Sequence, residues 1–129
     1  MNIRRLQLEA LKTNFMHEYS VACEIIRIAE SCAVEKAALK VLNIGLVIGD
    51  YSGFIGESIQ MYFDEISIGS LCEGAIISIK QIHPKLKCRK CHKLFERQLF
   101  SFNCSECGGV GEPTDIGKEF YVEYIEVDT

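Results

Sequence analysis

Four of the seven cysteines of this 129-residue chain stand in two pairs, each with two residues between its members. The pairs are Cys88–Cys91 and Cys104–Cys107, and twelve residues separate them. Two intervening residues let both thiolates of a pair turn toward one ion, and two such pairs complete the tetrahedral coordination that zinc prefers. The spacing therefore predicts a zinc ribbon. Because four thiolates leave no open position for water or substrate, the zinc is expected to be structural.

Three other uses of the paired cysteines are compatible with this spacing: two disulfides, iron in a rubredoxin-like site, or a redox dithiol. Zinc is favoured because residues 84–117 are rich in Lys, Cys and Gly and too few to build an apolar core. Metal binding contributes folding free energy on the order of 10 kcal/mol in peptide-scale systems. Cys23, Cys32 and Cys72 lie outside the pairs and are interpreted as small buried apolar residues.

A second candidate for chemistry is His17, within the run Met16-His17-Glu18-Tyr19-Ser20. Its imidazole is a ligand type that suits zinc, copper, iron and nickel. A single histidine ahead of a helix is more often a solvated surface residue, so spacing alone does not assign it to a metal. His83 and His92 flank or enter the ribbon and are interpreted as surface imidazoles rather than accessory ligands.

Five segments carry a regular pattern that could position these residues. Apolar residues at helical spacing predict helices over about 17–34 and about 55–66. The segments 41–48 and 75–82 alternate with the period of two typical of strands. Residues 120–127 are rich in Tyr, Val and Ile and predict a third strand. The expected fold class is α+β, with two helices packed on a small three-stranded sheet and an inserted zinc-ribbon module.

The same patterns divide the chain into three parts. Residues 1–15 form a weakly amphipathic N-terminal extension, expected to be a short helix or disordered. Residues 16–83 together with 118–129 supply the helices and the sheet of one α/β domain. Residues 84–117 are expected to form the zinc-ribbon domain.

Composition and charge exclude several function classes. The formal net charge of −4 does not favour a general nucleic-acid binder, which needs many Lys and Arg contacts to phosphate. No uncharged apolar run approaches the roughly 18 to 20 residues of a membrane-spanning helix, and no secretory signal is evident, so a cytoplasmic protein is expected. No nucleophile with a neighbouring base, phosphate-binding loop or catalytic carboxylate pair stands out, so the chain is not expected to be an enzyme.

A basic cluster surrounds the first cysteine pair, formed by Lys85, Lys87, Arg89, Lys90 and Lys93. We interpret these cations as offsetting the formal double negative charge of a zinc tetrathiolate. The alternative is an adaptor that binds nucleic acid or an acidic protein partner through the cluster.

Longer runs of the sequence resemble a known family. The runs MHEYS, KVLNIGLVIGDYSG, ESIQMYFDEISIGSLCEGA and YVEYIEV, together with the two cysteine pairs, occur here in the order found in the HypA/HybF family of nickel-incorporation metallochaperones. The resemblance extends from Met16 to Val127. It implies a nickel-binding domain made of helices on a small sheet, with a zinc ribbon inserted before the last strand.

The resemblance also implies roles and partners. His17 would be the essential nickel ligand and Glu18 its neighbour at the site, while the four paired cysteines would bind zinc. The transported ion would be Ni²⁺. The expected partners are the nickel-binding GTPase of hydrogenase maturation and the large-subunit precursor of [NiFe]-hydrogenase, and some members also serve urease.

The N-terminus departs from the family pattern. In the family the Met-His-Glu motif begins the protein, so that a free amino group lies beside the histidine. Here fifteen residues precede Met16, which turns that amine into an amide whose proton is far less acidic. Either Met16 is the true first residue, or the chain is extended and its nickel affinity or ligand set differs.

Overall fold

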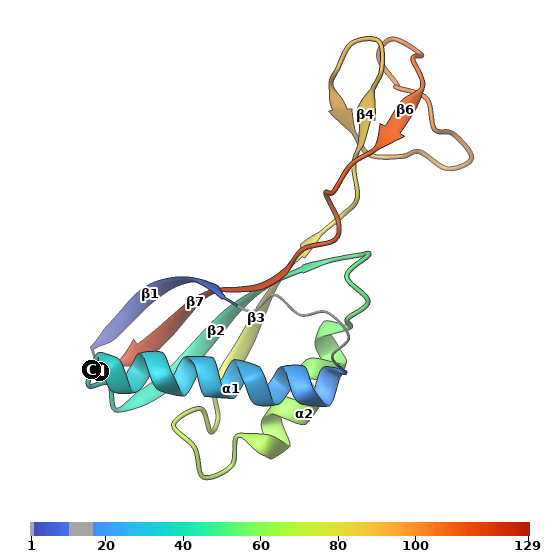
Figure 1. Ribbon diagram of the computed structural model, residues 1–129. Coiled ribbons are helices and arrows are strands. Elements are labelled where there is room, and N and C mark those ends of the chain that lie inside the picture. Colours follow the sequence, from blue (N-terminus) through green and yellow to red (C-terminus); the bar gives the residue numbers. More distant parts are fainter. Residues whose placement is uncertain (1, 11–16) are drawn as a thin grey trace.

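The computed structural model describes residues 2–10 and 17–129 (Figure 1). Two helices and seven strands follow one another along the described residues. Their order is β1 (Ile3–Ala10), α1 (Glu18–Glu35), β2 (Lys40–Gly49), α2 (Gly56–Ile66), β3 (Ile76–Ile82), β4 (Leu86–Cys88), β5 (Leu94–Phe95), β6 (Gly111–Pro113) and β7 (Phe120–Asp128). Neither helix is long and apolar enough to span a membrane, within the part of the chain that is described.

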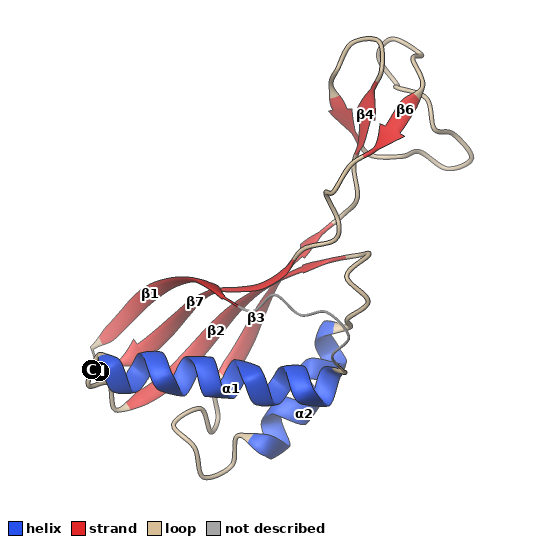
Figure 2. Cartoon of the chain, viewed as in Figure 1, coloured by secondary structure: helices blue, strands red, loops and turns tan. Residues whose placement is uncertain are grey.

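The larger sheet has the strand order β1-β7-β2-β3. Strands β2 and β3 are parallel and are joined through α2, whereas β7 is antiparallel to both of its neighbours. Both helices lie on the same side of this sheet (Figure 2). The two predicted helices and the three predicted strands are thus all present, and the α+β fold class is confirmed.

A single apolar core fills the space between the helices and the sheet. Helix α2 buries Ile59 and Phe63, and α1 buries six apolar residues on one face: Val21, Ala22, Ile25, Ile26, Ala29 and Ala33. The core residues of the sheet come from β2, β3 and β7: Val41, Ile44, Leu46, Ile48, Ile77, Val122, Ile125 and Val127. Each fully buried large apolar side chain contributes roughly 1.5–3 kcal/mol. This core holds the N-terminal ends of the helices at one end of the domain.

Strand β1 corrects the expectation for the N-terminal extension. Residues 1–15 were expected to form a short helix or to be disordered, and the sheet to have three strands. Instead Ile3–Ala10 pairs with β7 as a fourth strand. Leu6 and Leu8 pack against the core, and the Arg5 guanidinium lies 4.0 Å from the Tyr124 ring centre and 3.6 Å from Glu126. These contacts, rather than local propensity, stabilise the strand.

The ribbon is inserted between β3 and β7, as predicted. Its three short strands form a separate sheet with the order β5-β4-β6. Figure 1 shows this module at the end of two connecting segments, projecting away from the helices. The two structural units therefore have little shared surface.

Candidate metal sites

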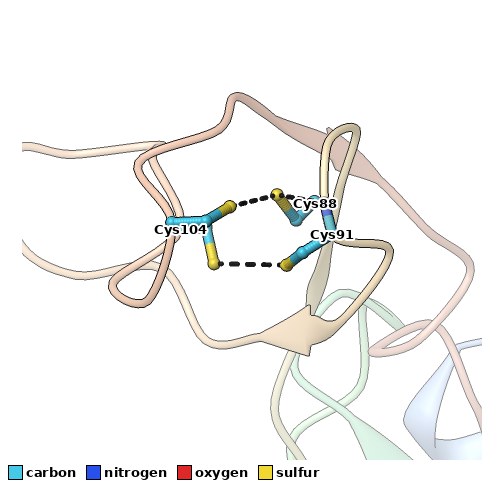
Figure 3. Close-up of side chains that lie close together, drawn as sticks. Cys88, Cys91 and Cys104 are labelled. Carbon is cyan, nitrogen blue, oxygen red and sulfur yellow. Dashed lines mark hydrogen bonds between the residues drawn. The ribbon is translucent and has the colours of Figure 1, made fainter.

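The four paired cysteines converge in the ribbon. Their sulfur atoms all lie within 4.8 Å of one another, and Figure 3 shows Cys88 and Cys91 facing Cys104. Cys88 Sγ is 3.3 Å from Cys107 Sγ, and Cys91 Sγ is 3.8 Å from Cys104 Sγ. A tetrahedral zinc ion with Zn–S bonds of about 2.3 Å places its sulfurs about 3.8 Å apart. The cluster thus has the size that a zinc tetrathiolate needs. Its sulfur atoms lie much farther apart than the roughly 2.0 Å of a disulfide bond.

Tight backbone turns bring each pair together. The Cys91 N–H points at Cys88 Sγ across 3.4 Å, and Gly108 N–H donates to the Cys104 carbonyl at 2.9 Å. Gly108 has φ +74°, which glycine adopts without strain. A Cβ at Gly109 would stand only 2.7 Å from Cys88 Sγ. The left-handed backbone therefore favours glycine at position 108, and the close approach to the Cys88 sulfur requires glycine at position 109.

The thiol pKa values show how the cluster distributes charge. A hydrogen bond from the Cys91 backbone N–H is the largest influence on Cys88 and lowers the pKa of its thiol to about 6. The Cys107 backbone N–H likewise lowers the pKa of Cys104. For Cys91 a backbone bond from Lys93 lowers the pKa, but burial and the neighbouring cysteines together raise it to about 11. The lowered pKa values favour thiolates at Cys88 and Cys104, and a bound cation would favour ionisation of Cys91 as well, which fits a divalent metal.

The basic cluster is partly neutralised by nearby acids. Arg89 lies 3.4 Å from Glu112 and Lys93 lies 2.6 Å from Glu106. The remaining lysines of the cluster make no ion pair with the residues that the structure describes. Two of its five cations are thus engaged within the ribbon itself.

His17 stands immediately before α1. It is the N-terminal cap residue, with an extended backbone (φ −92°, ψ 161°), and its carbonyl accepts the first helical hydrogen bond from Val21 N–H at 2.9 Å. The residue is exposed, and its side chain does not cap the helix. The imidazole is therefore accessible to an ion from solvent.

Glu18 joins the starts of the two helices. Its Oε2 accepts a hydrogen bond from the backbone N–H of Ile55 at 3.1 Å. Ile55 is the cap residue of α2 and has no side-chain oxygen with which to cap that helix itself. One residue along, Tyr19 packs edge-on against Tyr62 of α2, with ring centres 5.7 Å apart. The carboxylate beside His17 is thus held through one oxygen, by a contact that no local sequence pattern predicts.

A further polar group links the end of β2 to the start of the ribbon connection. The His83 ring Nδ1 lies 2.8 Å from Asp50 Oδ2, and Gln81 Nε2 donates to Asp50 Oδ1 at 2.7 Å. The hydrogen bond with His83 lowers the pKa of Asp50 and in turn raises the pKa of His83. Asp50 and these two partners are about thirty residues apart in sequence, so no local pattern predicts the contact.

The structure does not bring His83 or His92 to the cysteine cluster. Within the described residues, the group of metal-ligating side chains close enough to share one ion contains only the four cysteines. His92 directly follows the first cysteine pair, is exposed and has φ +63°. Both histidines remain interpreted as surface imidazoles.

Comparison with known proteins identifies the family. Residues 16–127 match the family model described as "Hydrogenase/urease nickel incorporation, metallochaperone, hypA". The chain belongs to the HypA family. It is 39% identical over 114 residues to the "Hydrogenase maturation factor HypA" of Caldanaerobacter subterraneus subsp. tengcongensis, covering 88% of this chain and 100% of that protein. The protein of the same description from Dehalococcoides mccartyi is 35% identical over 113 residues, covering 88% of this chain and 95% of its own length.

Two solved structures share the fold. The first, described as "Solution structure of HypA protein", has a TM-score of 0.63 at 26% identity and covers 88% of this chain and 98% of its own. The second, "Solution structure of the Ni metallochaperone HypA from Helicobacter pylori", has a TM-score of 0.58 at 26% identity and covers 88% and 99%. The resemblance inferred from the sequence is confirmed.

Membership of the HypA family also confirms the functional class. Its members are nickel metallochaperones of hydrogenase maturation rather than enzymes, as predicted. The family match begins at Met16, so β1 lies outside it. The four-cysteine cluster lies inside the match and has the donor set of a structural zinc site.

Proposed function

We propose that this HypA-family chain binds Ni(II) at His17 and delivers it during maturation of [NiFe]-hydrogenase. The observation that carries this proposal is the exposed His17 imidazole at the start of α1, which the helix does not use as a cap. Such a side chain can take up an ion and release it without disturbing the core. A buried imidazole could do neither.

The ligand chemistry of the site suits nickel. Ni(II) binds nitrogen donors in square-planar or tetragonal arrangements, and imidazole is a suitable donor. The His17 backbone nitrogen adds a second donor within the same residue when its amide proton is lost. Glu18 supplies a carboxylate beside it, whose Oε2 is held by Ile55 while Oε1 makes no hydrogen bond with the described residues. We propose His17 and Glu18 as nickel-site residues on these grounds.

The ribbon would hold zinc through Cys88, Cys91, Cys104 and Cys107. When bound, this zinc supplies a structural cross-link between the two cysteine pairs. Nickel transport would therefore depend on the α/β domain, and the ribbon would contribute shape and contacts. We accordingly propose residues 16–83 with 118–129 as the nickel-binding domain and 84–117 as the zinc-ribbon domain.

A role in hydrogenase maturation implies partners of that pathway. We propose the nickel-binding GTPase and the hydrogenase large-subunit precursor, with urease as a further client, and the cytoplasm as the place of action. The adaptor alternative gains little support, because Arg89 and Lys93 of the basic cluster already pair with acids in the ribbon. A nucleic-acid complex would weaken steeply with added salt, whereas nickel chelation would barely respond.

Metal analysis of a His17→Ala variant tests the proposal. We expect about one zinc per chain in the parent and in the variant, and loss of added nickel in the variant alone. His92→Ala is the matched control, because it removes an imidazole that is also exposed and should leave nickel binding intact. Nickel retained by His17→Ala would refute the site.

A further inference from the structure

A hollow of about 220 Å³ lies where the ribbon joins the α/β domain. Its lining comes from four separate segments of the chain: Tyr51; Pro84, Lys85 and Leu86; Arg97 and Phe102; and Pro113, Thr114 and Ile116. Pockets for drug-sized molecules measure roughly 300–1,000 Å³, so this hollow is suited to one large side chain rather than to a cofactor.

Contacts between these segments hold the walls of the hollow in place. The Arg97 guanidinium lies over the Phe102 ring, 4.1 Å from its centre, and the Phe102 carbonyl accepts a hydrogen bond from Gly111 N–H at 2.9 Å. On the opposite wall, Thr114 Oγ1 donates to the Lys85 carbonyl at 2.6 Å. Because the walls are already ordered, a ligand that enters the hollow loses little binding free energy to ordering them.

The inside of the hollow is mainly apolar, and the chain does not fill it. Phe102 is 55% exposed, although it lines the hollow together with two prolines, Leu86 and Ile116. The neighbouring Leu99 and Phe100 do not line it and are 84% and 91% exposed. Exposed apolar surface costs hydration free energy, which an apolar side chain entering the hollow would recover.

The charged side chains around the hollow are all cations. Lys85 and Arg97 line it and are exposed, whereas no Asp or Glu of the described residues does so. The ion pairs that the structure describes within the ribbon engage Arg89 and Lys93 and leave Lys85 and Arg97 without an acidic partner. A complementary ligand therefore combines an apolar group with negative charge on either side of it.

We propose that this hollow binds an acidic segment of a protein partner. One large apolar side chain of the segment enters the hollow, and carboxylates that flank it pair with Lys85 and Arg97. The Arg97 guanidinium can hold a carboxylate through two parallel hydrogen bonds, and Lys85 acts as a point charge. Since Tyr51 belongs to the α/β domain, the bound segment contacts both units of the chain. This site adds to the proposed nickel role and does not depend on it.

A peptide suits the hollow better than a nucleic acid does. Single-stranded nucleic acids bind where a row of cations follows the backbone and free aromatic faces stack on the bases. Here the hollow has two cations, and Arg97 already covers one face of the Phe102 ring. One apolar side chain and two solvent-exposed ion pairs give weak, reversible binding, with a Kd of about 10 µM to 1 mM.

Fluorescence anisotropy with the zinc-loaded full chain tests the proposal. The probe is a short fluorescein-labelled peptide in which one Phe stands between two pairs of acidic residues, with both ends blocked. We expect saturable binding that weakens by about tenfold or more when Ser replaces the Phe of the peptide. Replacing its acids by Gln should also weaken binding, and NMR shifts on adding the parent peptide should cluster at Leu86, Phe102 and Ile116.

Charge reversal on the protein separates this site from general stickiness. A variant with both Lys85→Glu and Arg97→Glu should lose the acidic peptide and bind the matching peptide that has Lys in place of its acids. Lys85→Glu alone, which keeps the contact between Arg97 and Phe102, should change both affinities in the same directions but by less. Zinc analysis checks that each ribbon is folded. The matched control combines Lys36→Glu with Lys80→Glu, two exposed lysines of the α/β domain, and should leave peptide binding unchanged.

Three results would overturn the proposal. The first is no binding of the acidic peptide at about 1 mM protein, and the second is binding that the double charge reversal leaves unchanged. The third is tighter binding of a short single-stranded RNA that is lost in the same variant, which would assign the hollow to nucleic acid. These measurements contain no nickel, so their failure leaves the proposed nickel site standing, and the failure of that site leaves the hollow.

Discussion

In the α/β domain, eighteen buried residues from both helices, three strands and the segment between α2 and β3 form one apolar core. In the ribbon, the buried apolar residues are Cys88 and Cys104 alone. The first unit is stabilised by surface removed from water, and the second depends on four sulfur atoms and the ion they can share. One chain thus combines a unit whose stability comes from an apolar core with a unit whose folding is coupled to metal binding.

The largest expected difference between the two units follows the removal of zinc. A strong chelator, or a Cys88→Ser change, should unfold the ribbon, because no apolar core remains to hold it. Hydrogen exchange followed by NMR should show loss of protection over 86–113, while the amides of α1 and β2 stay protected. Loss of protection in α1 would contradict the separation of the two units.

The converse experiment is Phe63→Ala in the core. Phe63 is fully buried, so its truncation should cost about 3–5 kcal/mol. Thermal unfolding of the α/β domain should shift to a lower temperature, while the zinc content of the ribbon stays the same. Met61→Ala on the same helix is the control, because Met61 is 57% exposed. A parallel loss of zinc would mean that the two units are coupled.

The N-terminal strand offers a third and smaller effect. Protein beginning at Met16 lacks β1, so it should lose the contacts of Arg5 and Leu6 with the sheet and unfold at a lower temperature. It should nevertheless bind nickel more tightly than protein beginning at Met1, because it presents a free amine beside His17. Calorimetry with both proteins measures this difference. Equal affinities would show that the amine is not a ligand.

Local pattern explains which features could be predicted from the sequence. Helix α1 was expected over about 17–34 and spans Glu18–Glu35, because its periodicity reports the face that it buries. The cysteine cluster was predicted because zinc geometry fixes the spacing of its ligands. Both signals are contained within short segments.

The features that were missed depend on partners distant in the sequence. Strand β1 pairs with β7 at the other end of the chain, and its own residues alternate only weakly. The Glu18 carboxylate accepts a hydrogen bond from the backbone N–H of Ile55, and no pattern of side chains predicts this contact. The left-handed Phe100 likewise gave no signal, since glycine is the residue expected in such a conformation.

The smallest expected effect concerns the Asp50–His83 pair, which lies where the two units meet. The pKa of His83 is raised by its hydrogen bond to Asp50, so this contribution to stability is full below about pH 6.5, the usual histidine value, and is lost as the pH rises through the raised pKa. The pKa of Asp50 is lowered, so its contribution is present above its usual value of 3.8 and is lost on acidification. The pair should therefore stabilise the connection most between these limits.

An NMR titration of the His83 ring measures the direction in which its pKa is shifted. Asp50→Asn removes the charge but keeps a hydrogen-bonding oxygen, so the pKa of His83 should fall back toward its ordinary value. Because the His83 side chain is 63% exposed and that of Asp50 33% exposed, salt should weaken the effect in the parent protein. A His83 pKa that does not change in Asp50→Asn would show that the pair is a solvent-screened contact, and the link between the α/β domain and the ribbon would then be carried by the backbone alone.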